Sequence, residues 1–331
     1  MSAPASAVPR ALERDERFPT TSDGWALQLT RFVDRAAFRP ELAPIVLVPG
    51  YGMNSFILGF HPGGTSLVHA LCASGREVWC ADLRGQGRSH RVDSGAPPPS
   101  LRRLAERDLP AACDAALEAS ESTAGRVDVL GCSLGGSLAF AYLALAPTPP
   151  VRRVVAIGSP LRWIATPGLL RAAFTSRRLA GAIRIAGTRR VAGLVFPLAG
   201  KLPGLLALYA NAANIDLEEA ATMVRTVEDP HPRMNRDIAA WVKHGDLVLR
   251  GVNVTEAMRR RREPLLLVAA NRDGIVPEAT ALGPREVWGG PVSVLRVGTP
   301  ERWYAHADLF VGREAPERVF APIVSWLDRP E

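Results

Sequence analysis

The sequence has few of the features that would indicate a secreted, metal-binding or membrane-spanning protein. Its 331 residues include only four cysteines, whose spacing fits neither a disulfide framework nor a set of metal ligands: Cys72, Cys80, Cys113 and Cys132. No run reaches the length of about 18 apolar residues that a membrane-spanning helix needs. Residues 1–17 are charged where a signal peptide would be apolar. We therefore expect a cytoplasmic protein with reduced thiols, without a metal or another cofactor.

Lysine is almost absent, although the chain is basic. The formal net charge is +7, and only Lys201 and Lys243 are lysines, so arginine carries nearly all of the positive charge. The arginines are spread along the chain, and no nucleic-acid-binding motif accompanies them. We therefore expect no nucleic-acid partner; an anionic substrate or a membrane surface remains as an alternative reason for the basic charge.

Internal repeats and low-complexity segments are also lacking. Hydrophobic residues make up 47 % of the chain, so it can bury a large core. The length exceeds that of a simple domain and suits one α/β domain that carries a large insertion.

The most informative stretch is residues 127–136, VDVLGCSLGG. A short apolar strand runs into G-x-S-x-G and then into an apolar helix, which is typical of a nucleophile elbow. Gly131 and Gly135 lack a Cβ, so the backbone can pass close on either side of a strained turn that exposes the Ser133 hydroxyl. The residue after such a serine presents its N–H to a developing oxyanion, which makes Leu134 the first expected donor.

Short apolar strands alternate with helices on both sides of this turn. The Asp23-Gly24 pair predicts a hairpin within residues 17–32, after a loose tail over residues 1–15. A helix over residues 100–120 is expected to kink near Pro110. The expected core strands are residues 45–48, 77–82, 127–130, 154–157, 265–269 and 292–297, with helices at 65–74, 134–146 and 316–327. This alternation predicts a doubly wound, mostly parallel sheet.

The alternation stops between residues 161 and 262, where helices dominate. We expect a helical cap there, inserted between core segments 1–160 and 263–331. Its apolar residues are expected to line an acyl-accepting cavity: Leu169, Leu170, Phe174, Leu205, Leu206, Leu208 and Tyr209. The same region carries interspersed arginines that form either a solvated face or a contact with a lipid surface: Arg171, Arg177, Arg178, Arg184, Arg189 and Arg190.

Five motifs then occur in the order found in the α/β-hydrolase superfamily, which the chain resembles over most of its length outside the cap. VLVPGYG resembles the oxyanion loop of that superfamily, ADLRGQGRS its signature after the next strand, and GCSLGG its elbow. NRDGIVP and AHADLFVG resemble its acid and histidine loops. The resemblance extends to lipase-like members and, less closely, to the polyhydroxyalkanoate synthases, which use cysteine where this chain has Ser133. It implies an α/β-hydrolase fold with a helical cap.

A serine nucleophile needs a base and a carboxylate, which follow it in the order acid, then histidine, in this superfamily. Three histidines follow Ser133 in the chain, and His231 and His244 fall in the expected cap. His306 follows the last expected strand, so we expect it to be the base. Asp273 follows the strand over residues 265–269 and is the expected acid, with Asp308 as the alternative.

The sequence thus predicts a serine hydrolase that cleaves a carboxylic ester or lipid-like acyl substrate through an acyl-enzyme. Ser133 would attack, and the N–H groups of Leu134 and Tyr51 would bind the oxyanion, with Gly52 as an alternative to Tyr51. Cys132 adjoins Ser133, but its side chain should point the opposite way and pack in the core. The alternatives are an acyltransferase or a polyhydroxyalkanoate synthase- or depolymerase-like enzyme, and a catalytically silent binding member. The sequence gives no indication of the oligomeric state.

Overall fold

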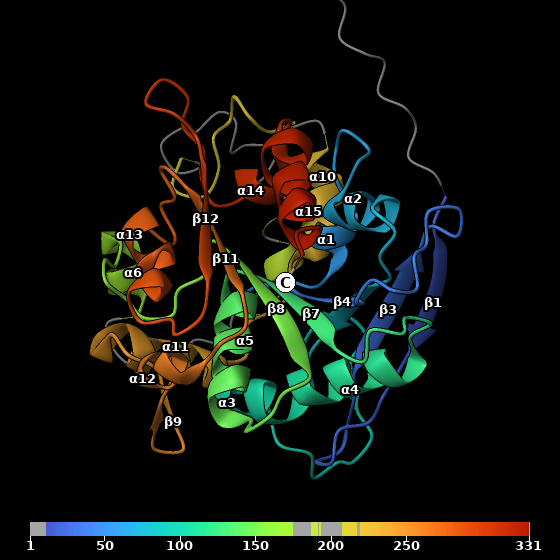
Figure 1. Ribbon diagram of the computed structural model, residues 1–331. Coiled ribbons are helices and arrows are strands. Elements are labelled where there is room, and N and C mark those ends of the chain that lie inside the picture. The colour runs from blue at the N-terminus through green and yellow to red at the C-terminus, as the bar shows by residue number, and fades with distance from the viewer. Residues whose placement is uncertain (1–10, 175–186, 191, 193–206, 217–218, 331) are drawn as a thin grey trace, which may run out of the picture.

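The centre of the molecule is an eight-stranded sheet in the order β1-β3-β5-β4-β7-β8-β11-β12 (Figure 1). A computed structural model describes residues 11–174, 187–190, 192, 207–216 and 219–330. All neighbouring strands from β5 to β12 are parallel, while β1 and β3 are antiparallel additions at one edge. The strands are β1 (Glu13–Arg17), β3 (Gln28–Val33), β4 (Ile45–Val48), β5 (Val78–Asp82), β7 (Val127–Cys132), β8 (Val151–Ile157), β11 (Leu265–Ala270) and β12 (Val292–Val297). The expected doubly wound, mostly parallel sheet is confirmed.

Helices cover both faces of this sheet, which is why its central strands are apolar runs without alternation. Every residue of β4, β7 and β11 is buried. One hydrophobic cluster holds the inner faces of α4 (Leu109–Ala119) and α5 (Leu134–Leu145). A second cluster holds those of α2 (Leu67–Ala73) and α15 (Ala321–Leu327), on the other side of the sheet (Figure 1).

Strand β1 begins at Glu13, within the segment expected to be a loose tail. Its sequence, ERDER, has no apolar alternation, so nothing local indicates a strand. It pairs antiparallel with β3, and its charges find partners there, as in the Arg31–Glu13 ion pair at 3.2 Å. The turn between the two strands is at Gly24, whose φ of 87° favours glycine, as expected for the Asp-Gly pair.

The helical stretch after Ser100 is irregular where a kink was expected. The Ser100 side chain accepts a hydrogen bond from the Arg103 N–H and caps α3 (Leu101–Arg103). A π-helical turn, Leu104–Asp108, follows and leads into α4. Pro110 is the second residue of α4, and because the helix runs on without a break from the π turn, its missing N–H removes one regular helical hydrogen bond. The irregularity is therefore the π turn just before the proline.

Between β8 and β11 the described chain contains short helices and two small strands. They are α6 (Gly168–Ala173), α10 (Ala220–Met223), α11 (Pro232–His244), β9 (Val248–Leu249), β10 (Val252–Asn253) and α12 (Val254–Ala257). Val254 and Met258, near the end of this excursion, are buried in the same cluster as α5. Of the cap residues named from the sequence, five lie outside the described residues: Arg177, Arg178, Arg184, Leu205 and Leu206.

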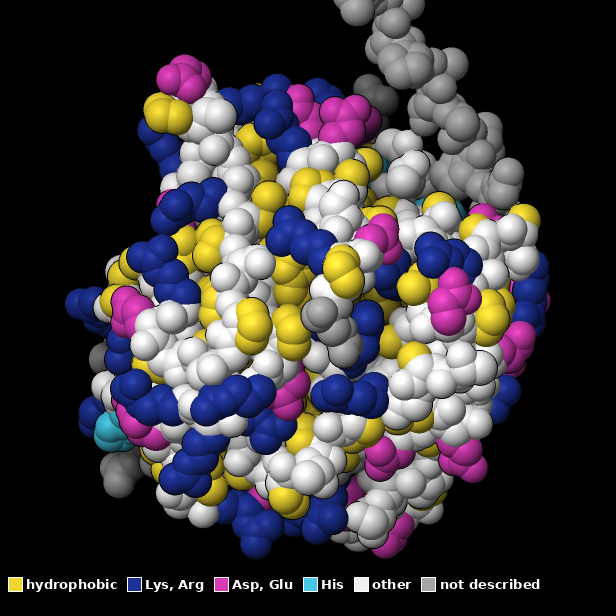
Figure 2. Space-filling view, in the orientation of Figure 1, with side chains coloured by type: hydrophobic (Ala, Val, Ile, Leu, Met, Phe, Trp, Pro, Cys, Tyr) yellow, Lys and Arg dark blue, Asp and Glu magenta, His cyan; other side chains and the backbone are white. Residues whose placement is uncertain are grey.

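The described chain also contains several shorter elements. They are β2 (Trp25–Ala26) paired with β6 (His90–Arg91), α1 (Phe56–Gly59), α13 (Glu278–Ala281) and α14 (Asp308–Val311), and a π turn, Pro316–Phe320, before α15. In the part of the chain that is described, no helix is both long and apolar enough to cross a membrane. On the visible face, basic side chains are scattered among acidic and apolar ones and do not form one patch (Figure 2).

Candidate active site

Ser133 joins β7 to α5 in a backbone conformation that residues other than glycine rarely adopt. Its φ is 52° and its ψ is −117°. Its N–H donates to the carbonyl oxygen of Ile157 at 2.8 Å, which ties the turn to the end of β8. Strain of this kind in a side-chain-bearing residue is concentrated at functional sites. The turn has the sharp strand-to-helix form expected of an elbow.

Glycines make this turn possible because backbone occupies the space that side chains would need. A Cβ added to Gly131 would lie 2.2 Å from the Gly136 nitrogen, and one added to Gly135 would lie 2.2 Å from the Val48 oxygen. Real Cβ atoms do not approach backbone so closely, so both positions require glycine. The start of α5 can thereby pack against the end of β4.

His306 and Asp273 form a buried pair at the ends of neighbouring strands. The Nδ1 atom of His306 lies 2.6 Å from Oδ2 of Asp273, and the two side chains are 4 % and 1 % exposed. The other carboxylate oxygen accepts the N–H groups of Ile275 and Val276, each at 2.8 Å. Because Nδ1 contacts the carboxylate, Nε2 is the ring nitrogen that can accept a proton from another group.

The elbow and this pair meet at Gly158, the residue after β8. A Cβ added to Gly158 would lie 3.0 Å from Cε1 of His306 and 3.5 Å from Oδ2 of Asp273. Its neighbour Ile157 is the residue whose carbonyl holds the Ser133 N–H. The structure therefore brings Ser133, Asp273 and His306 together at the carboxyl ends of the parallel strands, since they follow β7, β11 and β12.

The loop after β4 passes directly beside Ser133. A Cβ added to Gly50 would lie 3.1 Å from the Ser133 Cβ, so the backbone at Gly50 and Tyr51 borders the elbow. Leu134 is the first residue of α5, and the first N–H groups of a helix have no carbonyl within it to bind. The two N–H groups expected to bind an oxyanion thus belong to backbone on either side of the serine.

The Tyr51 side chain points to α11 and α6. Its hydroxyl donates a hydrogen bond to Oδ1 of Asn235, and its ring meets that of Phe174 edge to face with centroids 6.4 Å apart. Burial raises the pKa of Tyr51 above its ordinary value, so the phenol stays protonated. The sequence did not predict the contact of Asn235 with Tyr51, because no local pattern relates two residues that are 184 positions apart.

The excursion returns to the site at Leu208 and Tyr209. The Ala307 N–H donates to the Tyr209 carbonyl at 2.8 Å, and the Tyr209 ring lies 6.1 Å from that of His306. A Cβ added to Gly274 would lie 2.5 Å from the Leu208 oxygen. This segment therefore packs on both the acid loop and the histidine loop.

A small cavity of about 40 Å³ opens beside the expected oxyanion donors. Its volume holds about three water-sized groups. The walls include Tyr51, Leu134 and the side chains of Pro99, Leu104, Met234, Gln86, Glu228 and His231. The lining therefore combines apolar residues with polar and charged ones: Arg84, Gln86, Glu228, Asp229 and His231. His231, one of the two histidines in the expected cap, accepts the Arg233 N–H at the start of α11.

Two neighbouring residues that could compete for catalytic roles have other surroundings. Cys132 is buried in the core, and burial raises the pKa of its thiol well above the usual range. Asp308 accepts the Ala305 N–H at 2.8 Å and the Asn211 N–H at 3.1 Å, and burial raises its pKa to about 6. Asp308 therefore holds the loop on which His306 lies, whereas Asp273 contacts the imidazole itself. Among the described residues, no group of three or more His, Cys, Asp or Glu side chains could hold a metal ion.

Comparisons with known proteins agree with this architecture. The chain is similar to a hydrolase from Pseudomonas aeruginosa PA01, at 19 % identity and a TM-score of 0.63, over 95 % of this chain and 99 % of that one. An esterase from Exiguobacterium antarcticum matches at 15 % identity and a TM-score of 0.60, over 95 % and 100 % of the two chains. A carboxylesterase from Bacillus subtilis matches at 15 % and 0.58, over 97 % and 93 %. At these low identities, the TM-scores show a shared fold and nothing beyond it.

No curated protein matches the chain in sequence. The family model described as the alpha/beta hydrolase fold matches residues 43–290, which is most of the chain. That span includes β4 with its following loop, the elbow at Ser133 and the acid loop at Asp273. The chain belongs to the α/β-hydrolase fold family.

Proposed function

We propose that this protein is a serine hydrolase that cleaves carboxylic esters through a covalent acyl-enzyme. The observation that carries the proposal is the buried His306–Asp273 pair at 2.6 Å, packed on Gly158 next to the strained Ser133 turn. A hydroxyl, an imidazole and a carboxylate arranged in this way can activate a weak nucleophile. The names of two similar proteins, an esterase and a carboxylesterase, support an ester as the substrate.

Each residue of the site has a separate role in the proposed reaction. The Ser133 Oγ attacks the ester carbonyl carbon while its proton passes to Nε2 of His306. Asp273 accepts the Nδ1–H and stabilises the imidazolium that forms. The carbonyl oxygen becomes an oxyanion, which the N–H groups of Leu134 and Tyr51 bind.

The remaining steps release the two products. His306 gives its proton to the alkoxide oxygen as the ester bond breaks, and the alcohol leaves an acyl group on Ser133. A water molecule then attacks the acyl carbon, with His306 taking its proton, and the acid leaves as Ser133 regains its hydrogen. An acyltransferase would differ only at this point, because another hydroxyl or a thiol would replace the water.

We assign residues 161–262 to a cap over the site and residues 1–160 and 263–331 to the catalytic core. Contacts of three cap residues support this assignment: Phe174 and Asn235 touch Tyr51, and Tyr209 faces His306. The small cavity beside Leu134 would receive the acyl part of a small-molecule ester. Contact of the cap arginines with a lipid surface is a secondary part of the proposal.

A fluorophosphonate probe tests the proposal directly. It reacts with an activated serine and stays bound to Oγ. We expect one adduct per chain, located at Ser133 by peptide mass spectrometry, with hydrolysis of p-nitrophenyl butyrate lost in parallel. Ser133→Ala, which retains Cys132, is the matched control and should take up no probe. Folded protein that takes up no probe, or takes it up elsewhere, would contradict the proposal.

A further inference from the structure

A second cavity, of about 460 Å³, lies on the sheet outside the proposed catalytic residues. Alternate residues of a strand share one face of the sheet. Arg14 of β1 lies opposite Phe32 of β3, and Thr30 of β3 lies opposite Cys80 of β5. The floor of the cavity is therefore one face of these three strands. Its described lining includes none of Ser133, Tyr51 and Leu134. We call this cavity the edge groove.

The walls of the edge groove are aromatic on one side and basic at the rim. Phe56 stacks on Phe60 with ring centroids 5.1 Å apart, and the guanidinium of Arg225 lies over the Phe56 ring at 4.5 Å. The groove lining contains arginines from four separate segments of the chain: Arg14, Arg88, Arg189 and Arg225. The lining also carries the polar residues Gln28, Thr30 and Asp82, so its apolar surface is limited to Phe32, Phe56 and Cys80. Aromatic side chains with arginines around them suit a molecule that is apolar in its body and anionic at one end.

Three of these four arginines already have carboxylate partners. Arg14 and Arg88 both pair with Glu16. Arg189 pairs with Glu228 at 3.0 Å. Arg225 is exposed, and no described carboxylate lies within 4.0 Å of its guanidinium.

The acidic side chains of the groove are also occupied. Asp82 accepts the backbone N–H of Ser55 at 2.6 Å and its hydroxyl at 2.9 Å. Glu228 accepts the Asn54 side-chain amide at 2.6 Å in addition to Arg189, and its carboxylate also bonds the Gly87 N–H. Glu228 borders both the edge groove and the small cavity beside Tyr51, so it forms the wall between them. Among the described residues of the groove, Arg225 is therefore the arginine whose guanidinium has no carboxylate partner.

We propose that the edge groove is a second binding site, which takes an amphipathic anion: a flat apolar body against Phe32 and the edge of the Phe56 ring, which Phe60 and Arg225 already overlie, with a carboxylate or phosphate on Arg225. Arg225 can give such a group two parallel N–H bonds while it remains stacked on the Phe56 ring. This site goes beyond ester hydrolysis, since it needs neither Ser133 nor His306.

Isothermal titration with 1-naphthyl phosphate tests the site. We expect binding at least about tenfold tighter than that of inorganic phosphate, which lacks the apolar body, or of 1-naphthol, which lacks the charge. 1-Naphthoate distinguishes carboxylate from phosphate recognition, and we expect either anion or both to bind. If neither naphthyl anion binds more tightly than 1-naphthol, the proposal is wrong.

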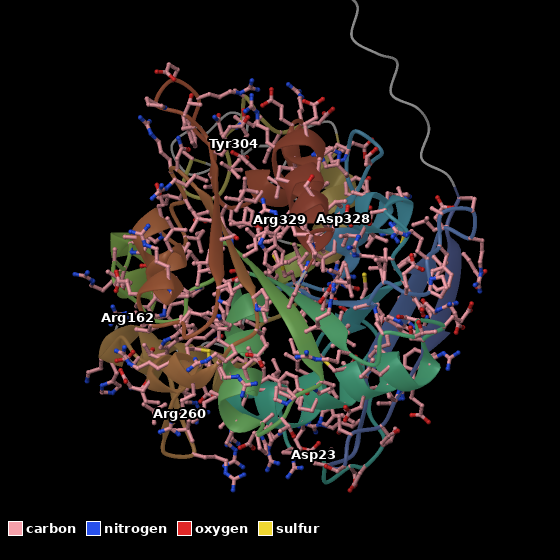
Figure 3. All side chains as sticks on the ribbon, viewed as in Figure 1. Asp23, Arg162, Arg260, Tyr304, Asp328 and Arg329 are labelled. Atoms are coloured by element: carbon pink, nitrogen blue, oxygen red, sulfur yellow. The ribbon has the colours of Figure 1, made fainter. Side chains whose placement is uncertain are left out.

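Variants locate the binding. Arg225→Gln should weaken 1-naphthyl phosphate by about tenfold or more, Arg225→Lys by less, and Phe56→Leu should weaken the naphthyl anion but not inorganic phosphate. Arg260→Gln is the matched control, because Arg260 lies on the opposite side of the molecule from β1 and β3 (Figures 1 and 3). Equal affinity of wild type and Arg225→Gln would overturn the assignment.

Occupation of the catalytic serine separates this site from the proposed active site. Protein modified at Ser133 by the fluorophosphonate should bind 1-naphthyl phosphate with unchanged affinity, and loss of binding would place the ligand in the active site and overturn the proposal. If the probe does not react, the titrations with the Arg225 variants still decide the groove. These experiments therefore distinguish a failure of the edge-groove proposal from a failure of the proposed function.

Discussion

The Tyr51 hydroxyl donates a hydrogen bond to Oδ1 of Asn235 across 184 positions of sequence. This bond joins the loop after β4 to α11, and Asn235 is buried at 4 % exposure. Because the N–H of the same tyrosine is the proposed second oxyanion donor, the bond would fix backbone that the proposed reaction uses. The position of α11, in the proposed cap, is thereby connected to the proposed oxyanion site.

Tyr51→Phe should lower kcat by about tenfold with little change in KM, because a loosened donor affects the transition state more than the bound ester. The variant also leaves the Asn235 oxygen without its donor, which should cost about 1–3 kcal/mol of unfolding free energy. Asn235→Asp retains an acceptor for the hydroxyl and should keep more activity. Steady-state kinetics check this; an unchanged kcat in folded Tyr51→Phe would make the side chain a pocket wall only.

Replacement of the two aspartates near His306 should have different effects. Asp273→Asn should lower kcat by about four orders of magnitude, since an amide favours the wrong imidazole tautomer. Asp308→Asn should lower kcat by less than about tenfold and act mainly on stability, because Asp308 accepts backbone N–H groups of Ala305 and Asn211. Kinetics and thermal unfolding of both variants separate the two roles. A greater loss of kcat at Asp308 than at Asp273 would reassign the acid.

Asp82 makes the stability of the fold depend on pH. Burial raises its pKa to about 6, above the value of 3.8 for a free aspartate, so the folded state holds a proton that the unfolded chain has lost. Its contribution to stability is therefore full below about pH 4 and declines as pH rises through 6. The cost of ionisation has an upper limit of about 3 kcal/mol.

Asp82→Asn imitates the protonated acid, since its amide can keep both hydrogen bonds to Ser55. Melting curves at pH 8 should show the variant more stable than wild type by up to about 4 °C. The difference should vanish at pH 4. A variant less stable than wild type at pH 8, or a difference independent of pH, would contradict this account.

Under the proposed function, we expect the small cavity beside Leu134 to set the acyl preference. With room for about three water-sized groups, it should favour acetyl to butyryl esters over the lipid-like end of the range that the sequence suggested. Met234→Ala removes a wall of this cavity and should move the optimum toward longer chains, by roughly tenfold in relative kcat/KM for two added methylenes at about 0.8 kcal/mol each. A series of p-nitrophenyl esters measures this.

Val248→Ala is the matched control for the cavity, because Val248 is 56 % exposed on β9. It should leave the chain-length profile as in wild type. A profile that Met234→Ala also leaves unchanged would show that the acyl group binds elsewhere.

The core of the fold was predictable because its signals are local. The β4 and β11 strands are apolar runs that any reading of hydrophobicity finds, and the Ser133 turn is marked by glycines that only a tight crossing requires. The pairing of Asp273 with His306 followed from motif order. Each of these features is determined within a few residues of sequence or by the order of the strands.

The features that escaped prediction depend on distant partners. Strand β1 is charged throughout and is a strand only because β3 pairs with it. Arg84 is buried with Asp108 and with Asp23, which is marked in Figure 3, and neither partner is near it in sequence. Such contacts arise from the assembled fold, and no spacing rule indicates them.

The central claim is that the Ser133 oxygen is the nucleophile. The kcat of Ser133→Ala for p-nitrophenyl butyrate, measured beside Cys132→Ala with both variants shown to be folded, tests it most directly. We predict a loss of at least about 10⁴-fold for Ser133→Ala and substantial activity for Cys132→Ala, whose thiol is buried and protonated. An active Ser133→Ala together with an inactive Cys132→Ala would contradict the account.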